Sequence, residues 1–169
     1  MTLKTFESHG ISDDTEHPAL QLKKILVPID FSPASTNAFK YALRLAEEFA
    51  AELTLIYILA PGPLRSYASI PGAPAFSESD LSGAEKNLRA LISSARNGSA
   101  QRVRSTMRIG VPSHEIVEMA KDGDIDLIVI ATHGYTGWKH FCIGSTAERV
   151  VRAAPCPVLV VREKEHQFC

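Results

Sequence analysis

The sequence predicts an α/β domain built on an open, doubly wound sheet of five parallel strands, in the order 3-2-1-4-5, with helices on both faces. Three observations support this prediction. Short β-rich runs alternate with longer amphipathic runs, a pattern typical of right-handed strand–helix–strand crossovers. The run 127–131 is apolar throughout, as expected for a strand that is covered on both faces. A chain of 169 residues with 45% hydrophobic content suits one core rather than two.

The chain up to Ile109 supplies three expected strands and two helices. The first strand is expected at 25–30, and Ser32 followed by Pro33 predicts the start of a helix whose apolar positions recur up to Phe49. The second strand is expected at 53–59, and a second helix should run from Leu81 to Ala95 before Gly98 stops it. Apolar and polar residues alternate over 103–109, which indicates an edge strand with one wetter face.

The second half continues the alternation. Pro112 opens a short helix that should end near Gly123, ahead of the strand 127–131 and a helix over 145–151 that ends by Pro155. The last strand is expected at 158–161. Its four consecutive apolar residues are unusual at an exposed edge, so we expect a partner subunit to cover it and form a homodimer through Val158 to Val161.

The domain organisation follows from these elements. Residues 1–21 form a polar extension that we expect to be flexible, 22–163 form the single domain, and 164–169 are a tail. Within the domain, 60–80 is rich in Pro, Gly and Ser and is expected to be an irregular insertion, either a lid or a disordered segment.

The composition excludes several classes of function. A net charge of -1 without a basic cluster gives no electrostatic basis for binding nucleic acid or an anionic membrane surface. Cys142, Cys156 and Cys169 have neither disulfide nor zinc-site spacing, which favours reduced thiols in a cytoplasmic protein. Residues 1–18 are polar with no apolar core, and no later apolar run approaches membrane-spanning length, so we expect a protein that is neither exported nor embedded in a membrane.

The segment between the fourth strand and the last helix is the most informative part of the chain. Gly134, Gly137 and Gly144 lack side chains that would block close approach, and the first N–H groups of the following helix carry partial positive charge. Such an arrangement suits a phosphate. The alternative is an ordinary capping box made by Ser145 and Glu148 above a surface turn.

Asp30 ends the first strand and is a second candidate. If the first and fourth strands are neighbours, Asp30 and the 131–145 loop face one crevice beyond the carboxyl ends of the strands. The alternative is a turn-forming residue that caps the helix after Ser32 and Pro33.

Histidines give weaker signals. His133 and His140 flank the glycine loop, but catalysis would need a nucleophile or a substrate proton within reach, so exposed loop histidines are the favoured interpretation. His114 and Glu118 lie at i, i+4 spacing without a nearby third ligand, which favours a solvated helix face over a metal site.

Several separated segments, in order, resemble the universal stress protein family. They are KILVPIDFS at 24–32, GVPSHEI at 110–116, ATHGYTG at 131–137 and GSTAERVVRAAPCPVLVVR at 144–162, so the resemblance spans Lys23 to Arg162. It implies the adenine nucleotide alpha hydrolase-like form of the doubly wound fold. The nucleotide-binding branch carries the signature G-x2-G-x9-G-S/T, which here reads Ala131-x2-Gly134-x9-Gly144-Ser145, with one glycine replaced by alanine.

The resemblance implies roles for individual residues. The backbone of Ala131 approaches the ribose, and Asp30 accepts hydrogen bonds from the ribose hydroxyls or supports a nucleotide-bound divalent ion such as Mg²⁺; no metal site is expected from the protein alone. The full set of implied nucleotide contacts consists of an adenine slot (Pro28, Ile29, Ile58, Ile130), Asp30 and Ala131, and the loop and helix start (His133, Gly134, Gly144, Ser145, Thr146).

Three functions compete at this point. The leading hypothesis is a universal stress protein that binds an adenine nucleotide, with ATP favoured, between the first and fourth strands and acts in stress response or signalling. The second is a dimeric interaction protein of the same family without nucleotide, which Ala131 favours. The third is a slow ATPase; because there is no P-loop and Lys139 is not placed as in one, we expect at most weak hydrolysis.

Overall fold

The computed structural model describes residues 21–60, 76–95, 102–132 and 144–162. It contains a parallel sheet formed by β1 (Lys24–Ile29), β2 (Glu52–Leu59), β3 (Val103–Ile109), β4 (Leu127–Ala131) and β5 (Val158–Val161). The strand order is β3-β2-β1-β4-β5, and all four neighbouring pairs are parallel, which confirms the predicted topology. Residues 1–20 of the predicted extension, most of the 60–80 segment and the tail 164–169 lie outside the described residues.

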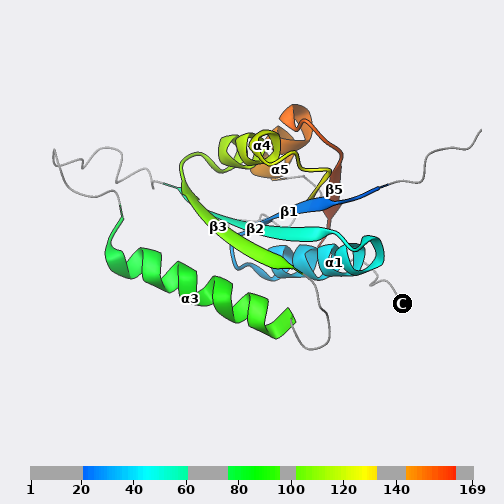
Figure 1. Ribbon diagram of the computed structural model, residues 1–169. Helices are drawn as coiled ribbons and strands as arrows, with labels where there is room; N and C mark the ends of the chain where they lie inside the picture. Colours follow the sequence, from blue (N-terminus) through cyan, green and yellow to red (C-terminus); the bar gives the residue numbers. More distant parts are fainter. Residues whose placement is uncertain (1–20, 61–75, 96–101, 133–143, 163–169) are drawn as a thin grey trace, which may run out of the picture.

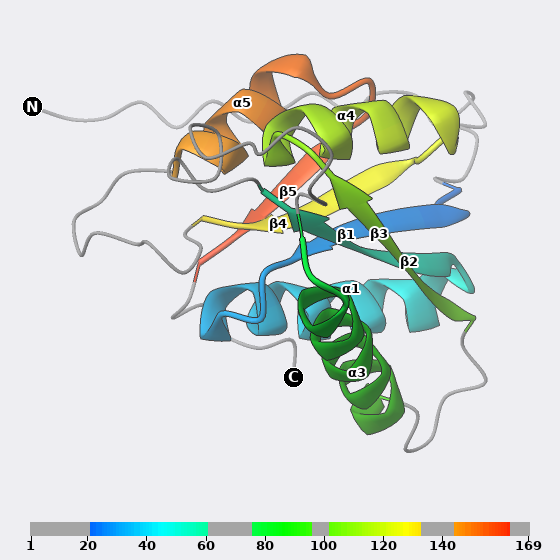
Figure 2. The same cartoon turned by 90° about the vertical axis from the view of Figure 1, so that its left-hand side faces the viewer.

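In the described part of the chain, four helices cover the two faces of this sheet (Figure 1). α1 (Pro33–Phe49) and α3 (Glu78–Ala95) lie on one face, and α4 (Pro112–Asp122) and α5 (Ser145–Ala153) lie on the other. Figure 2 shows the same layers with β1 and β4 side by side in the middle of the sheet. No helix within the described ranges combines the length and the apolarity that a membrane crossing requires.

Side chains of successive strand residues enter two separate cores, one on each face of the sheet. The core under α1 contains Val27 of β1, Val129 of β4 and Phe39 of α1. The core under α4 and α5 contains Leu26, Ile128 and Ile116. Because the central strands are buried on both sides, their sequences are apolar without alternation, as the run 127–131 predicted.

The helix starts show where capping was predicted well and where it was not. Ser32 caps α1 through its Oγ, which accepts from the Ser35 N–H at 3.1 Å, and Pro33 follows in the first turn as expected. α3 begins at Glu78, earlier than Leu81, because Ser77 and Asp80 form a reciprocal capping box. The Asp80 N–H donates to Ser77 Oγ at 3.2 Å, and the Ser77 N–H donates to Asp80 Oδ2 at 3.0 Å.

The β1–β4 pair is held tightly at its amino end. The carboxylate of Asp126, just before β4, accepts from the N–H groups of Lys23 and Lys24 at 2.8 and 2.9 Å. The Lys24 ammonium also donates to the Gly123 carbonyl at 2.7 Å. These bonds join segments far apart in the sequence and hold β1 and β4 together at their amino ends, opposite the carboxyl ends of the strands.

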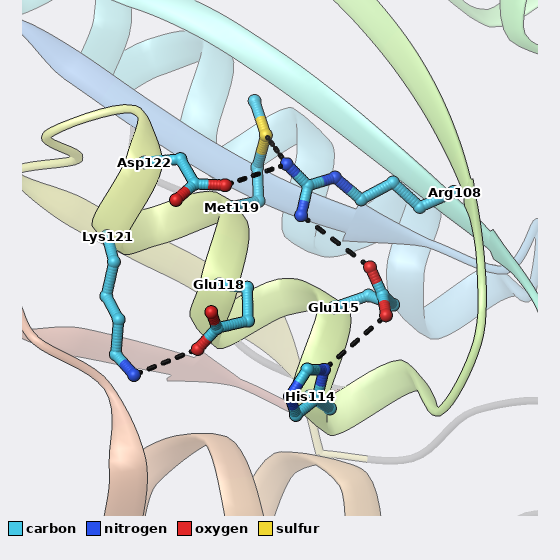
Figure 3. A network of polar contacts seen from close by, with 7 residues as sticks. All are labelled: Arg108, His114, Glu115, Glu118, Met119, Lys121 and Asp122. Carbon is cyan, nitrogen blue, oxygen red and sulfur yellow. Dashed lines mark hydrogen bonds and ion pairs between the residues drawn. The ribbon is translucent and has the colours of Figure 1, made fainter.

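Polar contacts join the edge strand β3 to α4 (Figure 3). The Arg108 guanidinium lies 3.6 Å from Glu115 Oε2 and 3.2 Å from Asp122 Oδ2, and it donates to Met119 Sδ at 3.5 Å. His114 Nδ1 is 3.4 Å from Glu115 Oε1, while Glu118 pairs with Lys121, so His114 and Glu118 contact other residues rather than a shared ligand. The Lys121 ammonium holds the pKa of Glu118 below its usual value.

Gly110 makes room for the Glu115 carboxylate in this contact. A Cβ at Gly110 would lie 2.6 Å from Glu115 Oε1, and the backbone has a φ of +157°. We expect Gly110→Ala to lower the free energy of unfolding by about 1–2 kcal/mol, because Glu115 must move away from Arg108 and the backbone is unfavourable for a side chain. Urea unfolding measures this loss.

A second glycine supplies the control for that measurement. Gly83 lies within α3, and a Cβ there would meet nothing within 4 Å. Gly83→Ala should therefore stabilise the protein by about 0.5–1 kcal/mol through helix propensity alone. Equal effects of the two substitutions would show that Gly110 is not required by the Glu115 contact.

Candidate functional site

The carboxyl ends of β1 and β4 and the amino end of α5 meet in one region. Thr132 follows β4, and its N–H donates to the Val161 carbonyl of β5 at 2.9 Å. The Thr132 carbonyl accepts from the Gly144 N–H at 2.7 Å. Thr132 and Gly144, which flank the 133–143 segment in the sequence, are therefore hydrogen-bonded to each other, which places the start of α5 directly at the end of β4.

Pro28 ends the ladder between β1 and β4. The pairing of β1 with β2 runs from Lys24↔Glu52 to Ile29↔Tyr57, but its pairing with β4 stops at Leu26↔Ile128. In a parallel sheet, the backbone N–H and C=O groups of successive residues point alternately to the two neighbouring strands, so the backbone of Pro28 points to the same neighbouring strand as that of Leu26. A proline has no N–H to donate to that strand. The missing donor explains why the two strands stop pairing toward the candidate site.

Asp30 lies immediately after β1 and makes a local turn. Its Oδ1 accepts from the Ser32 N–H at 3.0 Å, and its own N–H donates to Ser35 Oγ at 3.4 Å. Ser32, not Asp30, provides the cap of α1, so the interpretation of Asp30 as the helix cap is wrong. Asp30 instead holds its carboxylate against the backbone at the entrance to α1.

The start of α5 differs from the predicted capping box. The N-cap is Gly144, with φ −60° and ψ 151°, and it has no side chain with which to cap the helix. Ser145 is already the first helical residue, and the Glu148 carboxylate accepts from Arg152 at 3.0 Å rather than from the helix start. The capping-box prediction is wrong because a glycine occupies the cap position. Since glycine has no side chain, no N-cap side chain accepts from the N–H groups of the first turn.

The implied adenine residues and Ala131, which is implied for the ribose, divide between the two faces of the sheet. Ile58 and Ile130 belong to the core under α4 and α5, and Pro28 shares that face by alternation with Leu26. Ile29 and Ala131 lie in the core under α1. The side chains of Ile29 and Ala131 are thus on the opposite face from the other apolar candidates, although all five residues lie near the same end of β1, β2 and β4.

The remaining predicted residues are at the helix start or outside the described ranges. Ser145 is exposed and Thr146 is half-buried in the first turn of α5. His133 and Gly134 lie outside the described residues, as do Gly137, Lys139 and His140. Within the ranges that are described, no group of three or more His, Cys, Asp or Glu residues is placed to hold a metal ion.

Three buried polar residues lie near the site; Ser32 was predicted to start α1, whereas Ser35 and Thr132 were not singled out from the sequence. Ser32, Ser35 and Thr132 are 4%, 3% and 7% exposed, and Ser32 Oγ donates to Ser35 Oγ at 3.2 Å. In the described part of the chain, every buried side-chain nitrogen and oxygen atom has a hydrogen-bond partner. The spacing Asp-x-Ser-x-x-Ser at 30–35 was the available signal, because serines at the start of a helix commonly bond to the nearby backbone.

Cys156 lies away from this region, between α5 and β5. It packs against the core under α4 and α5, and burial, together with the nearby Asp126 carboxylate, raises the pKa of its thiol. We therefore expect Cys156 to be alkylated by iodoacetamide more slowly at pH 8 than an exposed thiol, since only the thiolate reacts. Peptide mass spectrometry measures this rate, with the urea-unfolded chain as the control; equal rates in the two states would contradict the prediction.

The fold and the candidate site define an open doubly wound α/β domain whose candidate site lies beyond the carboxyl ends of β1 and β4. The model of the universal stress protein family matches residues 21–162. A universal stress protein of Methanocaldococcus jannaschii is 36% identical over 145 residues, which cover 86% of this chain and 85% of that protein. The chain belongs to the universal stress protein family.

Solved structures agree with this assignment. The universal stress protein UspA from Lactobacillus plantarum has a TM-score of 0.70 and 28% identity, covering 85% of this chain and 99% of that one. A universal stress protein in complex with cAMP has a TM-score of 0.63 and 21% identity, covering 86% and 100%. Another, from Archaeoglobus fulgidus in complex with dAMP, has a TM-score of 0.63 and 20% identity, covering 84% and 99%.

Proposed function

We propose that this protein binds an adenine nucleotide, with ATP favoured, beyond the carboxyl ends of β1 and β4. The observation that carries the proposal is the glycine N-cap of α5, which is hydrogen-bonded to the end of β4 next to the strand that leads to Asp30. Helix N–H groups that have no side-chain cap suit phosphate oxygens, because they offer donors and partial positive charge. Relatives of the same fold that bind cAMP and dAMP support an adenine nucleotide.

Within this proposal each predicted residue has a role. Gly144, Ser145 and Thr146 bind the phosphates, with His133 and Gly134 completing the loop. Asp30 binds the ribose hydroxyls or supports a nucleotide-bound Mg²⁺. Pro28, Ile58 and Ile130 contact the adenine with their side chains, whereas Ile29 and Ala131 contribute backbone only, since their side chains lie in the core under α1.

We propose binding without appreciable turnover, in a stress-response or signalling role. Phosphoryl transfer needs a positioned cation and a group that orients the nucleophile. The sequence contains no P-loop, which supports retention of ATP rather than hydrolysis. A phosphate-release assay at saturating ATP measures this; turnover faster than about 1 per second, the lower end of ordinary enzyme rates, would contradict it.

Binding is tested directly by two measurements. Nucleotide released from the purified protein by denaturation is identified by mass spectrometry, and the stripped protein is titrated calorimetrically with ATP, ADP, dAMP and cAMP. We expect ATP to bind most tightly. Absence of nucleotide in the first measurement together with no heat in the second would favour the alternative function, an interaction protein that has lost nucleotide binding, for which Ala131 is the motivating feature.

We also propose a homodimer formed through β5. Val158, Leu159 and Val160 are half-buried at the edge of the sheet, and Val151 of α5 is 47% exposed. An apolar edge strand is stabilised when a second copy covers it. Sedimentation equilibrium should give twice the mass of 18.4 kDa, and a monomer at all concentrations up to about 100 μM, where even interfaces of modest affinity associate, would contradict the dimer.

A further inference from the structure

Phe31 has an unusual backbone conformation at the candidate site. Three non-glycine residues in the described ranges have positive φ: Phe31 at 64°, Ala50 at 51° and Asp124 at 47°. Ala50 and Asp124 follow the carboxyl ends of α1 and α4, where left-handed residues are common. Phe31 instead lies between β1 and α1, where no helix end requires this conformation and a bulky side chain disfavours it.

A ring contact accompanies this strained backbone. The rings of Phe31 and Tyr57 have centroids 4.9 Å apart and planes inclined at 37°. Tyr57 belongs to β2 and is paired in register with Ile29, two residues before Phe31. Both aromatic rings are partly buried against the core under α1. The strand therefore presents a rigid partner that holds the Phe31 ring in place.

The turn centred on Phe31 determines where the Asp30 carboxylate lies. Asp30 Oδ1 accepts from the N–H of Ser32, so the bonded groups lie on the two sides of Phe31. If Phe31 moved to a right-handed or extended conformation, the Ser32 N–H would rotate away from Asp30. The Phe31–Tyr57 contact, the left-handed backbone and the orientation of Asp30 are therefore geometrically linked.

We propose that Phe31, held by Tyr57, is a positioning residue that fixes the Asp30 carboxylate for the ribose or the nucleotide-bound cation. This inference rests on the proposed nucleotide binding and adds the residue pair that pre-organises it. Phe31 acts through Asp30 and needs no contact with the nucleotide. A pre-organised carboxylate binds more tightly because the free protein does not have to order it on binding.

A double-mutant cycle tests this link in the full-length protein. Phe31→Ala should weaken ATP binding about tenfold, the loss expected when one charge-assisted hydrogen bond is misplaced. In an Asp30→Ala background, Phe31→Ala should change the affinity by less than about twofold, because residues that act together are not additive. Equal weakening in both backgrounds would overturn the proposal.

Variants at both rings separate the ring contact from the backbone strain. Tyr57→Phe keeps the ring and should bind ATP within about twofold of wild type, whereas Tyr57→Leu should match Phe31→Ala. Phe31→Gly relieves the backbone strain but removes the ring that holds the turn against Tyr57, so this variant should also bind ATP more weakly than wild type. Wild-type affinity in Phe31→Gly would show that the ring contact is not needed and would overturn the inference.

A measurement without nucleotide completes the test. Three-bond NMR couplings should show one χ1 rotamer of Asp30 in the ligand-free wild type and averaged rotamers in Phe31→Ala; a single unchanged rotamer in the variant would contradict the positioning role. If wild type binds ATP and Asp30→Ala weakens it while Phe31→Ala does not, only this inference falls. If wild type binds no nucleotide, the proposed function falls, and this role falls with it.

Discussion

The Gly144→Asp variant is expected to be more stable than the wild type and to have lost most of its affinity for ATP. Gly144 has φ −60° and ψ 151°, a conformation that any residue adopts at a helix N-cap. An aspartate carboxylate there can accept from the N–H groups of Thr146 and Ala147 and thereby stabilise α5 by about 1 kcal/mol.

The same carboxylate occupies the donors that we assign to the phosphates and repels them. Loss of two charge-assisted hydrogen bonds corresponds to about 3 kcal/mol or more, which is a weakening of at least about 100-fold. Opposite changes in stability and affinity are diagnostic, because a damaged fold would lower both. Urea unfolding and calorimetric titration with ATP measure the two quantities.

Two further substitutions at this position serve as controls. Gly144→Asn offers a similar cap without the negative charge, so the difference between the Asp and Asn variants reports electrostatic repulsion of the phosphates. Gly144→Ala adds a side chain without a cap and reports the steric effect alone. ATP binding of wild-type strength in the Asp variant would contradict a phosphate site at the start of α5.

The largest effect on stability is expected for Phe39→Ala. Phe39 of α1 is 2% exposed and lies in the core that joins α1 to Val129 of β4 and Leu53 of β2. Removing a buried phenyl ring should cost about 3–5 kcal/mol through lost burial and the cavity left behind. Since domains of this size unfold with about 5–15 kcal/mol, this substitution removes a large share of the total.

A second phenylalanine of the same helix supplies the matched control. Phe49 is only half-buried at the carboxyl end of α1, so Phe49→Ala should have a clearly smaller effect. Urea unfolding followed by circular dichroism measures both variants. A similar loss for the two would mean that the interior of α1 does not organise the core as described.

The fold could be predicted from the sequence because its signals are strong and local. The apolar run 127–131 and the proline and serine at the start of α1 marked elements that the structure confirms, and the alternation over 103–109 identified β3 as an edge strand. Strand boundaries differed by one residue at Lys24, at Asp30, which lies just after β1, and at Glu52, where pairing with neighbouring strands determines the ends.

Features that depend on contacts across the fold could not be predicted in the same way. Two Ser-x-x-acid patterns looked alike in sequence, yet only Ser77 with Asp80 forms a capping box, because Gly144 occupies the cap position ahead of Ser145. The division of Ile29 from Ile58 and Ile130 depends on which face each strand residue occupies. The left-handed backbone of Phe31 has no sequence signal apart from its place in a turn.

The seam between β1 and β4 has a mechanical consequence for the whole sheet. At its amino end the Asp126 carboxylate accepts from the backbone at the start of β1, and toward its carboxyl end the pairing stops before Pro28. The seam joins β3, β2 and β1 to β4 and β5. Fewer backbone hydrogen bonds therefore have to break to separate β1 from β4 at the carboxyl end of the seam than at its amino end.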